Sequence, residues 1–188
     1  MSSCPVALTP VTAVERSALV RGGEAPLNWN IGAHMHIRRA HDHESEALSL
    51  IAQEAKAHWG YAVEVLAAWR PDLTVSRDSV TGLPTFVAEL EDGIAGFFQL
   101  GVSGGELELE HLWVRPSHMG KGIGRALLEQ AVREARSAGY PDLHIDADPH
   151  AEPFYLACGA VCSGSRPAPI AGDPGRVRPQ LVISVRMA

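Results

Sequence analysis

Two closely spaced glutamates in this chain could take part in acid–base chemistry. Glu108 and Glu110 lie within residues 107–114, where Leu, Leu, His and Trp alternate with Glu, Glu, Leu and Val. A strand has a side-chain period of two, so the alternation predicts both carboxylates on one face. Two such carboxylates raise each other's pKa, which suits a base that works near neutral pH. A solvated sheet face or a structural ion pair would fit the same spacing, and these alternatives stay open.

A glycine-rich segment follows the glutamates. Residues 118–125 read His-Met-Gly-Lys-Gly-Ile-Gly-Arg, and apolar residues then recur at helical spacing from Ile123 to Ala135. The segment therefore runs into the N-terminus of a helix, whose free N–H groups and dipole attract anions. Glycines at alternate positions let the main chain approach a ligand closely. The sequence predicts a phosphate-binding loop.

Two common phosphate-binding motifs do not fit this loop. A P-loop would follow its last glycine with Lys and then Ser or Thr, whereas Gly124 is followed by Arg125. A dinucleotide-binding fingerprint needs a surrounding βαβ unit, and the strands here are expected to be antiparallel.

The elements that must position these groups follow from periodicity and turn signals. Residues 85–90 and 94–100 predict a hairpin around Asp92 and Gly93. Further strands are expected at 35–38, 73–76, 107–114, 143–147, 181–185 and from 161 onward, and helices at 42–58, 63–69, 123–136 and 152–157. The proline-rich residues 167–179 are expected to form a loop that is long enough to carry function. This order predicts an α/β fold, with helices around a mostly antiparallel central sheet.

Composition narrows the class of protein. Hydrophobic residues make up 46% of the 188 residues, which suits one domain, expected at 34–188, after a flexible or strap-like arm at 1–33. A formal net charge of −6 argues against nucleic acid as a partner. No apolar stretch is long enough to span a membrane, and the N-terminus lacks the basic region of a signal peptide. Three cysteines without paired spacing favour a reducing compartment, so we expect a cytoplasmic location.

Two segments resemble motifs of one known family. Residues 114–128, Val-Arg-Pro-Ser-His-Met-Gly-Lys-Gly-Ile-Gly-Arg-Ala-Leu-Leu, resemble the acyl-CoA-binding motif of the GNAT N-acetyltransferases, in which Arg or Gln precedes two residues, Gly, one residue, and Gly or Ala. Gly122 and Gly124 match its glycines, but Met119 stands where Arg or Gln is expected. Residues 151–160, Ala-Glu-Pro-Phe-Tyr-Leu-Ala-Cys-Gly-Ala, resemble the family's second segment. Residues 56–61, 146–149 and 174–176 are similar to those of bacterial members without an assigned substrate.

The resemblance implies the GNAT fold from about His34 to the C-terminus, with acetyl-CoA as the acyl donor. It implies direct transfer of the acetyl group to a primary amine of a small molecule, and a homodimer is a further possibility. The cofactor would be held by Trp113, Val114, Met119, Gly120, Lys121, Gly122, Ile123, Gly124 and Arg125. Because Met119 offers no polar side chain, the pyrophosphate would rest on main-chain N–H groups. The negative net charge of the chain slightly favours cationic amines as acceptors.

The resemblance also assigns catalytic and acceptor residues. Glu110 is ranked first as the base and Glu108 second, and Tyr155 would act as the acid toward the leaving thiolate. Packing beside Phe154 is the alternative role of Tyr155. The acceptor side would carry His58, Trp59, Tyr61 and Arg176, with a core plug as the alternative for the first three. Arg176 would bind a carboxylate or fix the proline-rich loop.

Two other interpretations concern the function and a possible metal site. A GNAT-fold module that binds acyl-CoA without catalysis is the alternative function, and Met119 is the feature that favours it. The nine histidines include His34 and His36, and His41 and His43, but neither pair has a cysteine or carboxylate complement at ligand spacing. No metal site is expected.

Overall fold

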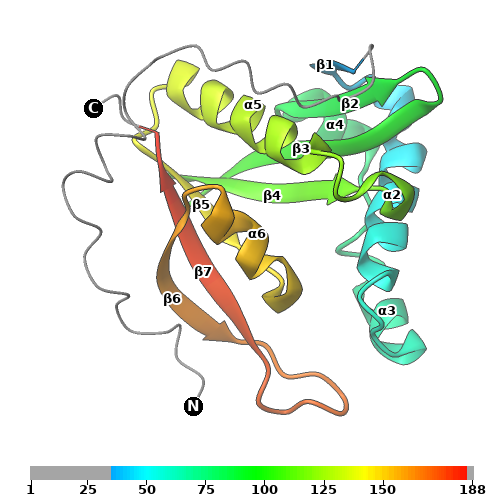
Figure 1. The fold of residues 1–188 in the computed structure, drawn as a ribbon, viewed down its shortest axis with the longest axis vertical. Helices are drawn as coiled ribbons and strands as arrows, with labels where there is room; N and C mark the ends of the chain where they lie inside the picture. The colour runs from blue at the N-terminus through cyan, green and yellow to red at the C-terminus, as the bar shows by residue number, and fades with distance from the viewer. Residues whose placement is uncertain (1–34, 186–188) are drawn as a thin grey trace.

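The computed structural model describes residues 35–185, so the expected N-terminal arm lies outside the described residues. The strands are β1 (His36–Arg39), β2 (Thr85–Leu90), β3 (Gly93–Ser103), β4 (Glu106–Val114), β5 (Asp142–Asp146), β6 (Val161–Pro167) and β7 (Val177–Ser184). They form one sheet in the order β1-β2-β3-β4-β5-β7-β6 (Figure 1). Adjacent strands are antiparallel except β4 and β5, which are parallel. The predicted mixed, mostly antiparallel α/β sheet is confirmed.

Helices cover both faces of the sheet (Figure 1). The α-helices are α2 (Ser45–Ala57), α3 (Val63–Trp69), α4 (Arg77–Gly82), α5 (Ile123–Ser137) and α6 (Glu152–Ala157), and the short 3₁₀ helices are η1 (Asp42–Glu44), η2 (Pro116–His118) and η3 (Pro149–Ala151). Two cores result. One contains the apolar side chains of α5 and α6, and the other those of α2 and α4. Phe97 and Phe98, adjacent on β3, belong to different cores and so mark the two faces.

Helix α5 forms where the helical spacing predicts it. Its buried residues are Ile123, Leu127, Leu128, Ala131 and Ala135, which line one face. Burying each large aliphatic side chain contributes roughly 1.5–3 kcal/mol, so this stripe fixes α5 against the sheet. The helix N-cap is Gly122, whose φ of 82° suits glycine. The phosphate-binding loop is therefore attached to a well-anchored helix.

Strand β4 departs from the expected alternation at Glu110. Gln99 of β3 pairs with His111 but Leu100 pairs with Leu109, so Glu110 is the extra residue of a β-bulge. The alternation predicted Leu107, Leu109, His111 and Trp113 on one face. That prediction is wrong beyond the bulge, because Leu112 and Val114 pack against the α5 core and Trp113 against the α2 core. A bulge adds one residue to a strand and therefore exchanges the faces of everything after it.

One expected strand is absent and one loop is shorter than expected. Residues 73–76 do not form a strand. Leu73 and Val75 are both buried, which mimics strand periodicity, but the Val75 N–H donates to the Ser49 hydroxyl at 2.9 Å instead of to a neighbouring strand. Helix α4 follows, capped by Ser76. Strand β7 begins at Val177 rather than at 181 and pairs with β6 as far as Pro167, so the proline-rich loop spans only 168–176.

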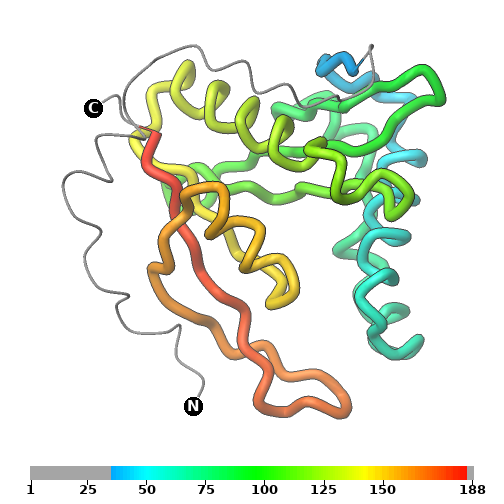
Figure 2. Tube along the Cα trace, in the orientation of Figure 1, coloured from blue at the N-terminus to red at the C-terminus, as the bar shows by residue number. Residues whose placement is uncertain are grey.

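The two halves of the sheet separate at β4 and β5. Within the described residues these parallel strands pair in register only at Glu108 and His144. Figure 2 shows the green part of the trace, with β2 to β4, diverging from the orange and red part, with β6 and β7. The space beyond this pairing contains the candidate site.

Candidate active site

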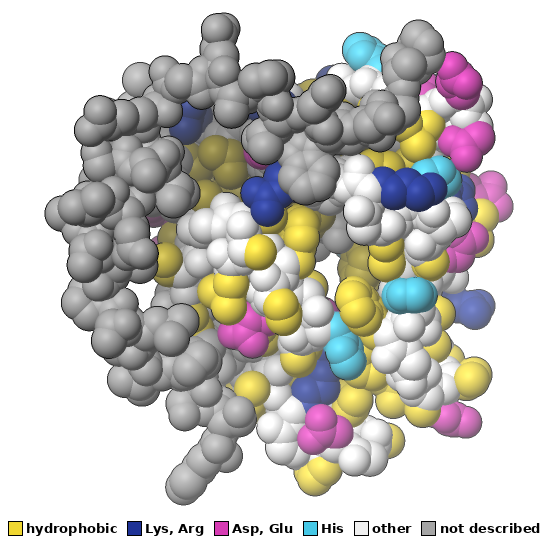
Figure 3. Space-filling model, in the orientation of Figure 1, with side chains coloured by type: hydrophobic (Ala, Val, Ile, Leu, Met, Phe, Trp, Pro, Cys, Tyr) yellow, Lys and Arg dark blue, Asp and Glu magenta, His cyan; other side chains and the backbone are white. Residues whose placement is uncertain are grey.

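A cavity of about 910 Å³ opens between the diverging strands. Its walls include residues 109–114 of β4, the loop and first turn of α5, residues 145–148 at and beyond the end of β5, and side chains from α2, α3 and α6. Hydrophobic and histidine side chains gather on the central part of the molecular face in Figure 3. The cavity therefore joins the predicted phosphate loop to the predicted catalytic strand.

Glu110 lies on the cavity wall, whereas Glu108 does not. Partial burial raises the pKa of Glu110 above its ordinary value, and the charge of Glu108 raises it further. The Glu110 carboxylate occupies the space beside Gly101, where a Cβ would lie 1.8 Å from Oε1. Of the two predicted bases, Glu110 is the one with both access to the cavity and an environment that favours proton uptake.

His111, next to Glu110, was not predicted as a site residue. Its Nδ1 accepts a hydrogen bond from Trp113 Nε1 at 3.0 Å, and its ring lines the cavity. Burial lowers the pKa of His111 to about 4, so the ring is neutral near pH 7 and carries its proton on Nε2. The alternation had placed Glu110 and His111 on opposite faces. The bulge, which the sequence does not reveal, sets both beside the cavity.

Tyr155 of α6 also lines the cavity, and the side chain is buried. Burial raises the pKa of its phenol, so the hydroxyl is protonated at neutral pH. The ring also packs edge-on against Phe154, with centroids 5.0 Å apart. The two roles considered for Tyr155 are thus compatible.

The glycine loop presents main chain to the cavity. Of the predicted cofactor residues, Trp113, Val114, Met119, Gly120, Gly122, Gly124 and Arg125 line it. Lys121 and Ile123 do not, and the Ile123 side chain is buried in the α5 core. The first N–H groups of α5 have no intrahelical acceptor and are available to an anion. A Cβ at Gly124 would make ordinary van der Waals contact with the Phe154 ring, at 3.4 Å.

The predicted acceptor residues divide into two groups. Trp59 and Arg176 line the cavity, whereas His58 and Tyr61 do not. Trp59 stacks on His150, with ring centroids 5.2 Å apart. The Tyr61 hydroxyl donates to Asp148 at 2.9 Å, and burial raises the pKa of this phenol to about 12.

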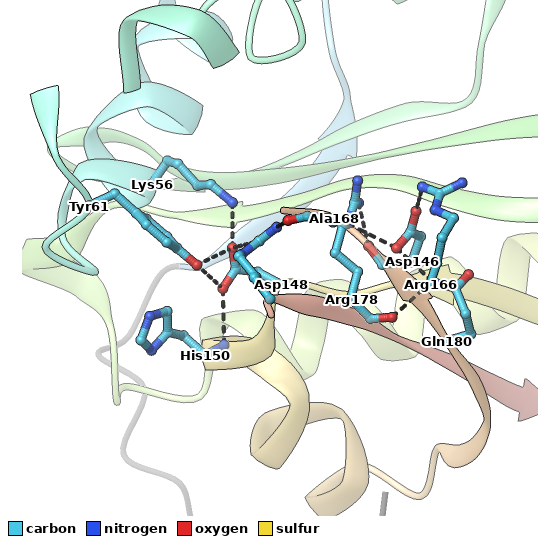
Figure 4. Close-up of polar contacts among 10 residues, drawn as sticks. Lys56, Tyr61, Asp146, Asp148, His150, Arg166, Ala168, Arg178 and Gln180 are labelled. Carbon is cyan, nitrogen blue, oxygen red and sulfur yellow. Dashed lines mark hydrogen bonds and ion pairs between the residues drawn. The ribbon is translucent and has the colours of Figure 1, made fainter. Parts of the chain in front are cut away.

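Lys56 and Asp148 lie at the centre of this region and were not predicted. Lys56 forms a salt bridge with Asp148 (Figure 4). Arg176 reaches the same carboxylate at 3.2 Å. Burial opposes ionisation of Asp148, but the Lys56 bond and charge hold its pKa below the ordinary value. A sequence signal for Lys56 existed, since it lies four residues after Ala52 on the apolar face of α2. Asp148 follows the carboxyl end of β5, a place where ligands commonly bind in α/β sheets.

Residues 35–185 contain neither a candidate metal cluster nor a candidate membrane-spanning helix. No group of three or more His, Cys, Asp or Glu side chains there is placed to hold a metal ion. None of the helices in this range combines the length and the apolar character that a membrane span requires.

Comparison with known proteins agrees with the fold and the loop. Residues 82–159 match the family model described as an acetyltransferase (GNAT) domain. The chain is 33% identical over 95 residues to L-amino acid N-acyltransferase MnaT of Escherichia coli K12, covering 43% of this chain and 55% of that protein. It is 31% identical over 119 residues to L-methionine sulfoximine/L-methionine sulfone acetyltransferase of Salmonella typhimurium LT2, covering 56% and 66%. The chain thus spans between half and two thirds of the length of these relatives.

Solved structures share the fold across most of the chain. A GCN5-related N-acetyltransferase from Rhodopseudomonas palustris superimposes with a TM-score of 0.68 at 20% identity, covering 81% of this chain and 96% of that one. The acetyltransferase yncA from Salmonella typhimurium, solved with its cofactor acetyl-CoA, gives a TM-score of 0.59 at 23% identity, covering 83% and 96%. Residues 82–159 thus form a domain of the GNAT acetyltransferase family, and the chain shares the fold of GNAT acetyltransferases over most of its length.

Proposed function

We propose that the chain is an acetyl-CoA-dependent N-acetyltransferase that moves an acetyl group to a primary amine of a small molecule by direct attack. The observation that carries the proposal is the cavity between β4 and β5, whose walls bring together the glycine loop, Glu110 and Tyr155. Both curated relatives have names that describe acyl transfer, to L-amino acids in one case and to methionine sulfoximine or sulfone in the other.

The residues that line the cavity are suited to a long, phosphate-bearing cofactor. Beyond Glu108, the residues of β4 have no register partner on β5, so this edge of the strand borders the cavity while the opposite edge pairs with β3. Trp113 and Val114 on this edge would hold the pantetheine arm, and Gly120, Gly122 and the start of α5 would hold the pyrophosphate. Arg125 lines the same end and adds a positive charge. When bound, acetyl-CoA supplies a thioester as the acyl source and a thiol as the leaving group.

Two side chains are suited to move protons. Glu110, with its raised pKa, can take a proton from the incoming ammonium group, directly or through water. Tyr155 stays protonated at Oη and can give its proton to the leaving sulfur. Main-chain N–H groups at the open edge of β4 can stabilise negative charge on the acyl oxygen. On the acceptor side, Trp59 and Arg176 would contact the amine substrate, with His58 and Tyr61 behind them.

The alternative function is a module that binds acyl-CoA without catalysis. Met119 favours it, because this cavity-lining residue gives the loop no polar side chain for a phosphate. The raised pKa of Glu110 and the buried, protonated Tyr155 favour an enzyme, since a silent binding module needs neither.

The test is release of free thiol from acetyl-CoA over a panel of small primary amines that includes amino acids. We expect turnover with at least one amine, a large loss for Glu110→Gln, and a smaller loss for Tyr155→Phe. CoA affinity, measured by calorimetry, should stay unchanged in both variants. Tight CoA binding with no turnover on any amine, and no effect of either substitution, would support the silent module instead.

A further inference from the structure

The wall of the cavity also contains two buried cations and one buried carboxylate. Lys56 and Arg176 both bind Asp148, and 8% of each of these cationic residues is exposed. The Asp148 side chain is equally inaccessible, with 8% exposed. These three residues, which we call the Asp148 triad, hold one more positive charge than negative.

The aromatic rings around the triad bring no negative charge. Lys56 Nζ lies 4.3 Å from the centroid of the Trp69 ring, and Arg176 Cζ lies 5.2 Å from it. Tyr61 flanks the same two cations. Cation–π contacts offset part of the desolvation of a cation, but the surplus charge remains. A buried charge is costly unless an opposite charge accompanies it.

The other carboxylates on the cavity wall are too exposed to supply that opposite charge at full strength. Asp72, Glu110 and Glu129 are exposed residues, so water screens their charges. Asp146 is half-buried and is already shared between Arg178, at 2.9 Å, and Arg166 (Figure 4).

The triad also has hydrogen-bond donors to spare. Within the described residues, Lys56 has Asp148 as its hydrogen-bond acceptor, which leaves other N–H groups of its ammonium unused. Arg176 donates to Asp148 and to the Ala168 carbonyl, while its Nε is buried without a partner in this part of the chain. A guanidinium group presents a planar fork that matches a carboxylate.

We propose that the Asp148 triad is an anion subsite, so that the preferred acceptor is a primary amine that also carries a carboxylate. This inference rests on the proposed acetyl transfer, and it assigns the acceptor's carboxylate to Lys56 and Arg176. Asp148 holds the two cations apart and oriented. The triad, rather than the net charge of the chain, then selects the acceptor. The preferred acceptor therefore differs from the cationic amines that the net charge alone would favour.

The test compares matched acids and amides by binding. L-methionine, L-leucine and L-phenylalanine are titrated against their carboxamides by calorimetry with saturating CoA, so that no acetyl group is transferred. Charge-assisted hydrogen bonds are strong enough that each acid should bind about 10- to 100-fold more tightly than its amide. Lys56→Met and Arg176→Gln should each reduce this ratio by about 10-fold, because each leaves a neutral pair with Asp148. Arg166→Gln is the matched control. Arg166 pairs with Asp146 but does not itself line the cavity, and Arg178 remains as a partner of Asp146, so this substitution should leave the ratio unchanged.

The outcomes separate this inference from the proposed function. Equal binding of acid and amide, absence of binding by any acid, or a ratio unaffected by Lys56→Met and Arg176→Gln would overturn the subsite. Each variant must retain CoA affinity and its circular dichroism spectrum, which shows that the fold is intact. Tight binding of acids without thiol release would support the subsite while contradicting acetyl transfer, and thiol release without any acid preference would do the reverse.

Discussion

At the scale of single residues, Glu110 decides how the reaction should depend on pH. Its pKa lies above the ordinary 4.5 because burial and Glu108 both disfavour its charged form. A base must be ionised to accept a proton, so kcat/KM should rise with pH through an apparent pKa above 4.5. Glu110→Gln should remove this limb and lower kcat/KM by about 10²- to 10⁴-fold. The measurement is a pH profile of kcat/KM.

Glu108→Gln provides the comparison for that profile. Glu108 does not line the cavity but raises the pKa of its neighbour. The Glu108→Gln substitution should shift the rising limb of the kcat/KM profile to lower pH and should leave most of the kcat/KM value intact. Loss of activity in Glu108→Gln together with normal activity in Glu110→Gln would reverse the order of the two bases.

His111 should make the protein less stable in mild acid. Its pKa is about 4 in the folded protein and near 6.5 when unfolded, so the unfolded chain binds more protons between these values. Stability therefore falls as the pH drops from about 6.5 to about 4, by about 2 kcal/mol already at pH 5. His111→Asn keeps an acceptor for Trp113 and should show a decline smaller by that amount. Urea unfolding at about pH 7 and about pH 5 measures both.

The sequence motifs identified some residues of the candidate site but not others, and the difference has a physical reason. Glu110 and Tyr155 were identified because each lies in a motif whose chemistry is local. Lys56, His111 and Asp148 were missed because their roles depend on contacts between distant segments. Lys56 meets a carboxylate 92 positions away. No local pattern encodes such a pairing.

At the scale of elements, Gly101 of β3 positions Glu110. A methyl group at Gly101 would lie 1.8 Å from Glu110 Oε1 and 2.9 Å from Cγ, so the flexible carboxylate would have to turn away. Gly101→Ala should lower kcat/KM by about 10²-fold while the free energy of unfolding changes by less than about 1 kcal/mol. Steady-state kinetics and urea unfolding measure the two effects.

Gly96 on the same strand is the matched control. There the added methyl group would lie 2.6 Å from the Trp113 carbonyl oxygen, which belongs to rigid backbone. Gly96→Ala should therefore lower stability. If Gly101→Ala instead lowered stability and left kcat/KM unchanged, Glu110 would not need its present position for activity.

The loop before α5 should bind phosphate through its main chain. Gly122→Leu would both strain a residue with φ of 82° and fill the anion site, so CoA affinity should fall by more than about 10-fold. Met119→Ala should change it by less than about 3-fold, because that side chain offers no donor. Gly139→Leu has a similar φ of 81° but lies off the cavity wall, and it controls for strain alone. A large effect of Met119→Ala in calorimetry would contradict this assignment.

Most elements could be predicted because their signals are local. The hairpin of β2 and β3, helix α3 and helix α6 begin or end within a few residues of their expected positions. Residues 73–76 were mistaken for a strand because Leu73 and Val75 alternate, although a side chain, Ser49, satisfies the backbone. The early start of β7 was also missed, since Pro179 and Arg178 look like loop residues until β6 pairs with them.

At the scale of the whole molecule, the β4–β5 separation should make stability depend strongly on CoA. The cavity takes its walls from both halves of the sheet, so a bound cofactor contacts both. At a CoA concentration 100 times its Kd, binding should add about 2.7 kcal/mol, or a rise in Tm of roughly 5–10 °C. Thermal unfolding with and without CoA measures the shift. The Gly122→Leu variant should show little of this CoA-dependent rise in Tm. A rise equal to that of the unsubstituted protein would contradict the assignment of the loop before α5 to CoA binding.

The bulge at Glu110 lets β4 carry the proposed base without giving it a place in the regular ladder. Deleting Glu110 would restore regular pairing with β3, because Leu109 opposite Leu100 and His111 opposite Gln99 would become consecutive pairs. Leu107, Leu109, Leu112 and Val114 would all keep their places at the α5 core. Deleting Leu109 instead would put Glu110 opposite Leu100, where it would face that core. A shortened β4 should therefore fold when Glu110 is the residue lost, and should fail to fold when a core residue is lost.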